Sequence, residues 1–208
     1  MKSEDVAHFL LNTPEFFDEH ADMLMQITLP HPHGGRTISL GERQLLALRE
    51  KNKSLEKRLH EMLEFAKEND ALQHKLHEFT NALFAARDLA TLQEMIPHLL
   101  RDIFSVPHVA LHLWQLTPPS MEVLVFTDEL VKPVCLHQAA HETASWFGES
   151  AALLHSFAYL PLHAGNVSIG LLVLASEDKQ RFYPEMGTVF LQFIADAASS
   201  AIHPYLDH

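Results

Sequence analysis

The sequence predicts an α+β protein in which N-terminal helices and one long, coiled-coil-like helix precede an antiparallel sheet flanked by helices. No glycine or proline interrupts the chain between Gly41 and Pro97. Leucine recurs in that stretch at spacings of three and four, as on a helix with a single apolar stripe. After Val106, short runs of alternating apolar residues are separated by turns, which is typical of an antiparallel layer. We therefore expect three parts: a helical segment 1–40, a long helix 41–88 and a domain 89–208.

The N-terminal segment carries helix start signals. Ser3 can cap a first helix, and Thr13-Pro14-Glu15 restarts one, with proline at the first helical position. Prolines and glycines between Leu29 and Gly35 predict a turn or loop. Ser39-Leu40-Gly41-Glu42 has the form of a capping box and is expected to open the long helix.

The long helix carries a heptad seam whose positions a and d are mostly apolar. The seam residues are Leu45, Leu48, Asn52, Leu55, Leu59 and Met62. A single helix cannot bury such a stripe, so a partner helix is implied, and we expect a homodimer. Asn52 at an a position favours a parallel two-stranded register, and Lys51 at g can pair with Glu56 at e of the other chain. The alternative is a helical hairpin formed with the N-terminal helices of the same chain.

The C-terminal part is expected to contain both strands and helices. A capping box at Thr91-Leu92-Gln93-Glu94 begins a helix that contains Pro97. The pattern predicts strands at 109–115, 122–127, 130–136, 158–163 and 169–176, with a turn at Gly165-Asn166. It also predicts helices at 137–147, ending at Gly148, and at 184–202.

The charge distribution argues against nucleic-acid binding. The formal net charge is −12, and residues 90–208 hold four bases (Arg101, Lys132, Lys179 and Arg181) against twelve acids. Phosphate backbones need clustered lysine and arginine. No apolar run reaches the length of a membrane span or signal peptide, and the single cysteine, Cys135, fits a reducing compartment. We expect a cytoplasmic protein that binds neither nucleic acid nor membrane.

Sixteen histidines raise the question of a metal site. His137 and His141 lie four residues apart on the predicted helix 137–147, a workable metal face, but no third ligand has a fixed relation to them. His108 and His112 can share a strand face. The expectation is that the histidines are ordinary residues and that no metal or other cofactor is bound. Cys135 has no partner in the chain for a redox cycle and is expected to be a small buried residue.

Two sets of residues resemble known families. Tyr159-Leu160-Pro161-Leu162, the Gly165 turn, the run from Ser168 to Ser176, Phe182 and Glu185 resemble a GAF domain, a PAS-like sensor module. Asn12-Thr13-Pro14-Glu15-Phe16-Phe17, Gly34-Gly35 and the segments 39–44 and 48–52 resemble an uncharacterised proteobacterial family, number 484 of the domains of unknown function. The resemblance implies a fold and no activity.

In a GAF-like fold a ligand pocket lies between the sheet and its cover, here about residues 130–154. The resemblance points to five candidate lining residues: Trp114, His137, His141, Trp146 and Phe147. The alternative is that the pocket has collapsed and these side chains are core. The chain has no phosphate-binding loop or nucleophile motif. We therefore expect a non-enzymatic sensory or regulatory protein that binds a small molecule or a protein partner. The alternative is a structural adaptor that docks a partner through residues 1–40.

Overall fold

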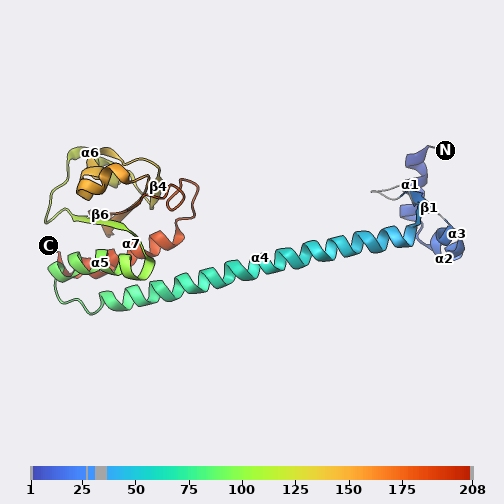
Figure 1. The fold of residues 1–208 in the computed structure, drawn as a ribbon, viewed down its shortest axis with the longest axis horizontal. Helices are drawn as coiled ribbons and strands as arrows, with labels where there is room; N and C mark the ends of the chain where they lie inside the picture. The colour runs from blue at the N-terminus through green and yellow to red at the C-terminus, as the bar shows by residue number, and fades with distance from the viewer. Residues whose placement is uncertain (1, 27, 31–36, 207–208) are drawn as a thin grey trace. The chain divides into compact units, whose positions relative to one another are not determined.

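The protein is represented by a computed structural model of residues 1–208, of which residues 2–26, 28–30 and 37–206 are described. The chain divides into two compact units, Met1–Lys67 and Glu68–His208. The boundary lies inside the longest helix, so each unit is described by itself (Figure 1). The expected fold class is confirmed: helices and one long helix precede an antiparallel sheet flanked by helices.

The first unit begins with three short helices and a strand pair. The elements are α1 (Ser3–Asn12), α2 (Glu15–Glu19), α3 (Ala21–Gln26), β1 (Thr28–Pro30) and β2 (Thr37–Ser39). Helix α1 begins one residue earlier than predicted, because its N-cap is Lys2 and not Ser3, and the carboxylate of Asp5 accepts a hydrogen bond from the backbone N–H of Lys2 at 2.9 Å. The antiparallel pair β1–β2 was not predicted. Most of the loop expected at 29–35 lies outside the described residues.

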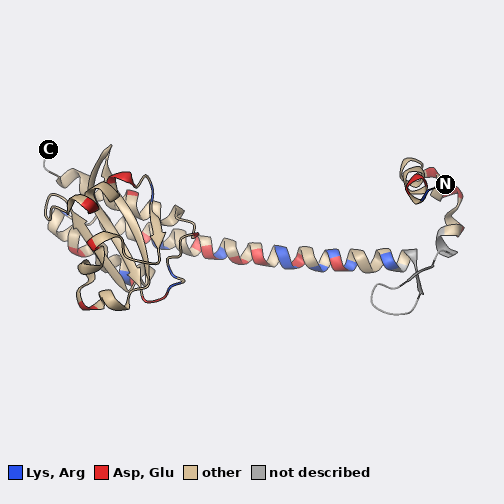
Figure 2. Cartoon of the chain, turned by 90° about the horizontal axis from the view of Figure 1, so that it is seen from above, with Lys and Arg blue, Asp and Glu red and all other residues tan. Residues whose placement is uncertain are grey.

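Helix α4 (Leu40–Leu83) runs for 44 residues. It begins directly after Ser39, where the capping box predicted a start. Basic and acidic residues alternate along it, so its polar faces carry both signs of charge (Figure 2). It ends in a turn in which Ala85 and Ala86 donate backbone hydrogen bonds to Ala82 and Leu83.

The second unit is built on one antiparallel sheet in the order β3-β6-β5-β4. Its strands are β3 (His108–Leu113), β4 (Val134–Leu136), β5 (Ser156–Ala164) and β6 (Val167–Ser176). Strands β5 and β6 are joined at Gly165, whose φ of 64° suits glycine. Strands β3 and β6 approach closely at Gly170, where a Cβ atom would lie 2.5 Å from the carbonyl oxygen of His112.

The two faces of this sheet pack against different layers. One face, with Leu160, Leu172 and Leu174, packs against α5 (Leu89–Phe104), α7 (Val189–Ile202) and the end of α4, where Phe79 and Leu83 are buried. The other face, with Phe157, Tyr159 and Val173, packs against α6 (Met121–Glu129) and the 3-10 segment η1 (His141–Leu153). Figure 1 shows α6 on one side of the sheet and α5 with α7 on the other. The alternation of side chains along β5 and β6 therefore supplies both cores.

Most expected elements of this unit are confirmed, and two are wrong. Residues 122–127 form helix α6 and not a strand, because Ser120 accepts a hydrogen bond from the backbone N–H of Val123 and caps a helix there. Residues 137–147 are not one helix. The 3-10 segment begins at His141, which itself has a φ of 51°, and a kink at Gly148 (φ 55°, ψ −128°) divides η1 into two short helices.

Two helix starts also differ from the prediction. Helix α5 is capped by Asp88, whose carboxylate accepts a 2.7 Å hydrogen bond from the backbone N–H of Thr91, so Thr91 is not the cap. Helix α7 begins at Val189, five residues after Pro184. A short segment η2 (His203–Tyr205) follows α7.

Candidate functional site

Three of the five predicted pocket residues lie in an aromatic cluster beneath η1. Trp114, Trp146 and Phe147 are half-buried and pack against the buried residues Phe157 and Tyr159. The Trp114 indole N–H donates a 3.0 Å hydrogen bond to Ser168 Oγ. These rings therefore belong to the second core of the domain, on the face of the sheet that η1 covers, as the alternative of a collapsed pocket expects.

Two histidines of β3 face the same cover. The ring of His112 stacks on Trp146, with centroids 3.8 Å apart and planes 15° from parallel, and His108 meets Phe147 edge-on. The prediction that these histidines share a strand face is confirmed. Burial lowers the pKa of His112, because desolvation disfavours the charged ring. His108 Nε2 lies 2.8 Å from a carboxylate oxygen of Glu177, and this hydrogen bond lowers the pKa of Glu177.

Tyr159 ties the start of the cover to the sheet. Its side chain is fully buried on β5, and its hydroxyl accepts a 2.8 Å hydrogen bond from the backbone N–H of Ala140. Thr143 Oγ1 donates to the carbonyl of Ala140 at 2.6 Å, so the Tyr159 hydroxyl donates its proton to Thr143 Oγ1 at 2.9 Å. Desolvation raises the pKa of Tyr159 despite these bonds, and its hydroxyl stays protonated. This three-residue network fixes the left-handed turn at which η1 begins.

The other two predicted residues, His137 and His141, are exposed and lie apart from the aromatic cluster's interior. They do not share a helix, because η1 begins only at His141, so the shared helix face that their spacing allows does not form. His137 borders a surface groove of about 450 Å³ with Gln138, His155 and Lys179. Within the described part of the chain, no three His, Cys, Asp or Glu side chains come together as metal ligands.

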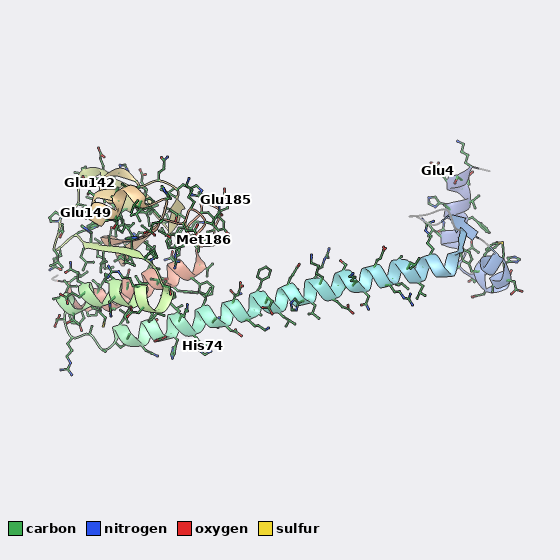
Figure 3. All side chains as sticks on the ribbon, viewed as in Figure 1. Glu4, His74, Glu142, Glu149, Glu185 and Met186 are labelled. Carbon is green, nitrogen blue, oxygen red and sulfur yellow. The ribbon has the colours of Figure 1, made fainter. Side chains whose placement is uncertain are left out.

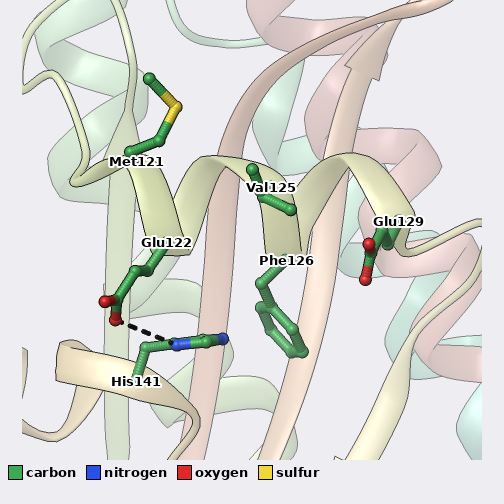
Figure 4. A pocket seen from close by; sticks show the side chains of 6 residues that line it. All are labelled: Met121, Glu122, Val125, Phe126, Glu129 and His141. Carbon is green, nitrogen blue, oxygen red and sulfur yellow. Dashed lines mark ion pairs between the residues drawn. The ribbon is translucent and has the colours of Figure 1, made fainter.

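His141 instead lines a groove on α6 that the sequence did not predict (Figure 4). Its Nδ1 lies 3.4 Å from a carboxylate oxygen of Glu122, and its ring meets Phe126 edge-on with centroids 5.4 Å apart. We call this site the α6 groove. It has a volume of about 320 Å³, and its lining residues are Met121, Glu122, Val125, Phe126, Glu129 and His141. The apolar spacing Met121–Val125 and the acidic spacing Glu122–Glu129 indicate one helix face, but this signal is visible only once residues 121–129 are known to be helical.

A third groove, of about 390 Å³, lies on α4 beside Asp70, Gln73, His74 and His77. His74 and His77 share a helix face, as their spacing predicts, and His77 Nε2 contacts the side-chain amide of Asn81 at 2.9 Å.

The seam of α4 is exposed along its apolar positions. Leu48 is 63% exposed and Met62 is 67% exposed, and the remaining members show the same tendency: Leu45, Asn52, Leu55 and Leu59. Figure 3 shows side chains projecting from the helix along its length. Since no described residue buries these side chains, the hairpin alternative receives no support from the first unit.

The single cysteine behaves as the sequence predicts. Cys135 lies on β4, is 1% exposed and belongs to the core beneath α5 and α7. Burial raises the pKa of its thiol to about 11, so it is neither a ready nucleophile nor a ready metal ligand. Over residues 2–26, 28–30 and 37–206, no helix is both long and apolar enough to span a bilayer.

Comparison with known proteins gives a family and a partial structural likeness to solved structures. A family model described as "Protein of unknown function, DUF484" matches residues 1–207. Similar solved structures include the crystal structure of the GAF domain from Acinetobacter phosphoenolpyruvate-protein phosphotransferase. That likeness has 18% identity and a TM-score of 0.47, and it covers 62% of this chain and 91% of that one. No curated protein matches the chain. Because the family model spans almost every residue, the resemblance expected from the N-terminal motifs is confirmed and the chain belongs to the DUF484 family of proteins of unknown function.

Proposed function

We propose that this protein is a non-enzymatic, cytoplasmic regulatory protein that dimerises through the α4 seam and binds a protein partner or small molecule through its GAF-like domain. One observation carries the proposal: the seam leaves a stripe of leucine and methionine exposed along a single helix. A helix whose apolar face is unpacked gains little stability from tertiary contacts. A second copy supplies the missing surface, with Asn52 facing Asn52 of the other chain and Lys51 pairing with Glu56.

The C-terminal end of α4 packs against the domain, so the helix that forms the proposed dimer is in direct contact with it. Leu76, Phe79 and Leu83 of α4 pack into the core formed by α5, α7 and the sheet. A change in the packing of that core therefore reaches α4 through direct contacts. Such a change regulates the dimer only if the ligand has different affinities for two arrangements of this core.

Oligomeric state tests the dimer directly. Analytical ultracentrifugation of the full chain at micromolar concentration is expected to give twice the 23.6 kDa chain mass. Leu55→Glu places a charge at a d position and is expected to return the protein to single chains, because a desolvated carboxylate is costly. Ser54→Glu adds the same charge one residue away on the outward face and should leave the mass unchanged. A wild-type mass of one chain would sink the proposal.

The binding of a small-molecule ligand to the domain is tested by the fluorescence of its two tryptophans. Both residues, Trp114 and Trp146, line the covered face of the sheet, so a ligand that enters beneath η1 is expected to alter their fluorescence. A panel of nucleotides, amino acids and divalent metals is titrated while emission is recorded. A compound that shifts both the emission and the melting temperature supports a small-molecule regulator.

The second candidate is a structural adaptor that has no small-molecule ligand. The close packing of Trp146 on His112, and of Phe147 near Phe157, favours it because these rings fill the covered face. In that case the compounds leave the emission unchanged, and a partner docks on residues 1–40 or on the domain surface. Removing residues 1–40 from an affinity-tagged chain is then expected to change the set of captured proteins.

A further inference from the structure

The α6 groove combines exposed apolar side chains with exposed acidic ones. Met121 is 73% exposed and Val125 is 48% exposed, one helical turn apart on the outer face of α6. Phe126 forms the floor and is half-buried against Tyr159, with ring centroids 5.3 Å apart. We propose that this groove docks a basic amphipathic helix of a protein partner.

The apolar part of the groove supplies the contact area. Residues four apart on a helix lie one above the other on a single face, so Met121 and Val125 form a short apolar strip. Methionine adapts its shape to irregular partners and is common on peptide-binding surfaces. A partner helix that lays leucine side chains on this strip buries surface that the chain itself leaves in water.

The acidic part of the groove sets the charge of the partner. Glu122 and Glu129 lie two turns apart on the same face, a rise of about 10 Å along the helix axis. Asp128 is also exposed on α6, and the sequence has no lysine or arginine between Arg101 and Lys132. A partner helix with two basic residues two turns apart, and leucines between them, matches both the carboxylates and the apolar strip.

The shape of the groove favours a helix over a small molecule. It is lined by one face of α6 and a single side chain of η1, His141, as Figure 4 shows. Small-molecule sites bury most of the ligand surface in a concave pocket, which one helix face and one imidazole do not provide. A helix needs only a shallow groove, because the rest of its contacts spread over neighbouring surface.

A partner docked in the α6 groove contacts residues that pack against η1, the segment that covers the sheet. The Glu122 carboxylate contacts His141, the first residue of η1, and Val123 and Thr127 of α6 are buried against the second core. A lysine that engages Glu122 therefore competes with His141 for the same carboxylate. This partner class deepens the regulatory function proposed above, but the groove does not include any seam residue.

The test uses a fluorescein-labelled helical peptide of roughly 15 residues, with two lysines two turns apart flanking leucines. Binding to the full chain is measured by fluorescence anisotropy, and the site is located from the methyl signals of ¹³C-methionine-labelled protein. The Met121 signal, assigned by its loss in Met121→Gln, is expected to move, whereas that of Met186, which packs against the core on the other face of the sheet, is not. The double variant Glu122→Gln/Glu129→Gln is expected to weaken binding about tenfold, since it removes two exposed charge pairs.

Matched variants separate this site from general attraction to an acidic protein. Glu149→Gln/Glu185→Gln removes two exposed acids elsewhere on the domain (Figure 3) and should retain wild-type affinity. A peptide with glutamates in place of the lysines should not bind. Equal affinity for both double variants, or an unmoved Met121 signal, overturns the proposal.

Two further outcomes identify a different occupant. If Glu122→Gln/Glu129→Gln lowers the mass of the protein alone, a second copy fills the groove and the proposal is wrong. If phenethylamine moves the Met121 signal and displaces the peptide at equal concentration, a small organic cation is the ligand and the proposal is also wrong. The assay is repeated with Leu55→Glu, because peptide binding by that variant is expected to persist. The assay with this variant therefore distinguishes an error in the proposed dimer from an error in the proposed docking site.

Discussion

Tyr159 is the residue that joins the sheet to its cover by hydrogen bonds. It is fully buried, and its hydroxyl both accepts from the backbone N–H of Ala140 and donates to Thr143. The same ring packs edge-on against Phe126, which forms the floor of the α6 groove. One side chain on β5 therefore positions both α6 and the start of η1.

Replacing Tyr159 with phenylalanine is expected to lower the free energy of unfolding by about 1–3 kcal/mol. The change keeps the ring and removes the oxygen, so the Ala140 N–H loses its partner in a half-buried position. Urea unfolding followed by circular dichroism measures the effect. Tyr183→Phe, at an exposed tyrosine, is the control and should change the free energy by less than about 0.5 kcal/mol. Equal effects of the two variants would show that the hydroxyl of Tyr159 contributes nothing.

The residues of the covered face could be predicted in part. Trp114, Trp146 and Phe147 lie there because large aromatic residues near a predicted sheet favour burial, and a resemblance placed the cover over them. The predicted helix 137–147 is wrong because a positive φ at His141 starts the turn there, so His137 and His141 do not share a helix. The sequence did not indicate the acids of the α6 groove, because residues 122–127 were predicted to be a strand. Residues three or four apart share a face only in a helix, whereas in a strand every second residue does.

At the scale of elements, the two long strands β5 and β6 were predictable and the short segment 122–127 was not. In β5 and β6 both faces are buried, so long apolar runs between turn residues determine them. Residues 122–127 contain three valine and threonine residues, which favour strands. The N-cap at Ser120 and the buried pair Val123 and Thr127, four residues apart, outweigh that preference. Local capping and tertiary burial thus decided the element, against its intrinsic propensity.

The cap of α5 gives a pH-dependent prediction. Hydrogen bonds from Thr91 lower the pKa of Asp88 below its usual value of 3.8. The unfolded state then binds this proton at a higher pH than the folded state, so the cap stabilises the fold above the usual pKa. That stabilisation is lost as the pH falls through the lowered pKa. Asp88→Ala is therefore expected to destabilise the protein at neutral pH and to differ less from the wild type near about pH 3.

Urea unfolding of both proteins across this pH range measures the difference. Glu94→Ala, at an exposed acid on the same helix, controls for the loss of a surface charge. A difference between wild type and Asp88→Ala that stays constant from neutral to acidic pH would contradict the role of the carboxylate.

At the scale of the whole molecule, the seam of α4 is the surface through which we propose that two copies associate. The sequence predicted its residues without any structure, because the heptad pattern is a property of spacing alone. The described chain adds that these side chains are exposed and that the far end of α4 is buried in the domain core. The wider apolar stripe beyond Leu59 also predicts that the end of α4 packs on the domain, and the burial of Phe79 and Leu83 agrees with this, but the heptad pattern does not give the residue at which that packing begins.

Asn52 tests whether the seam specifies a parallel pair. A polar residue at an a position destabilises a coiled coil but opposes other registers and oligomeric states, since only one arrangement pairs the two side-chain amides. Asn52→Leu is therefore expected to raise the melting temperature of the protein and to broaden its mass distribution beyond the dimer, as measured by calorimetry and sedimentation velocity. Ser54→Leu adds the same side chain on the outward face and should leave the dimer unchanged. If Asn52→Leu raises neither stability nor mass, Asn52 does not face its counterpart, and the two helices are either antiparallel or not paired along this stripe.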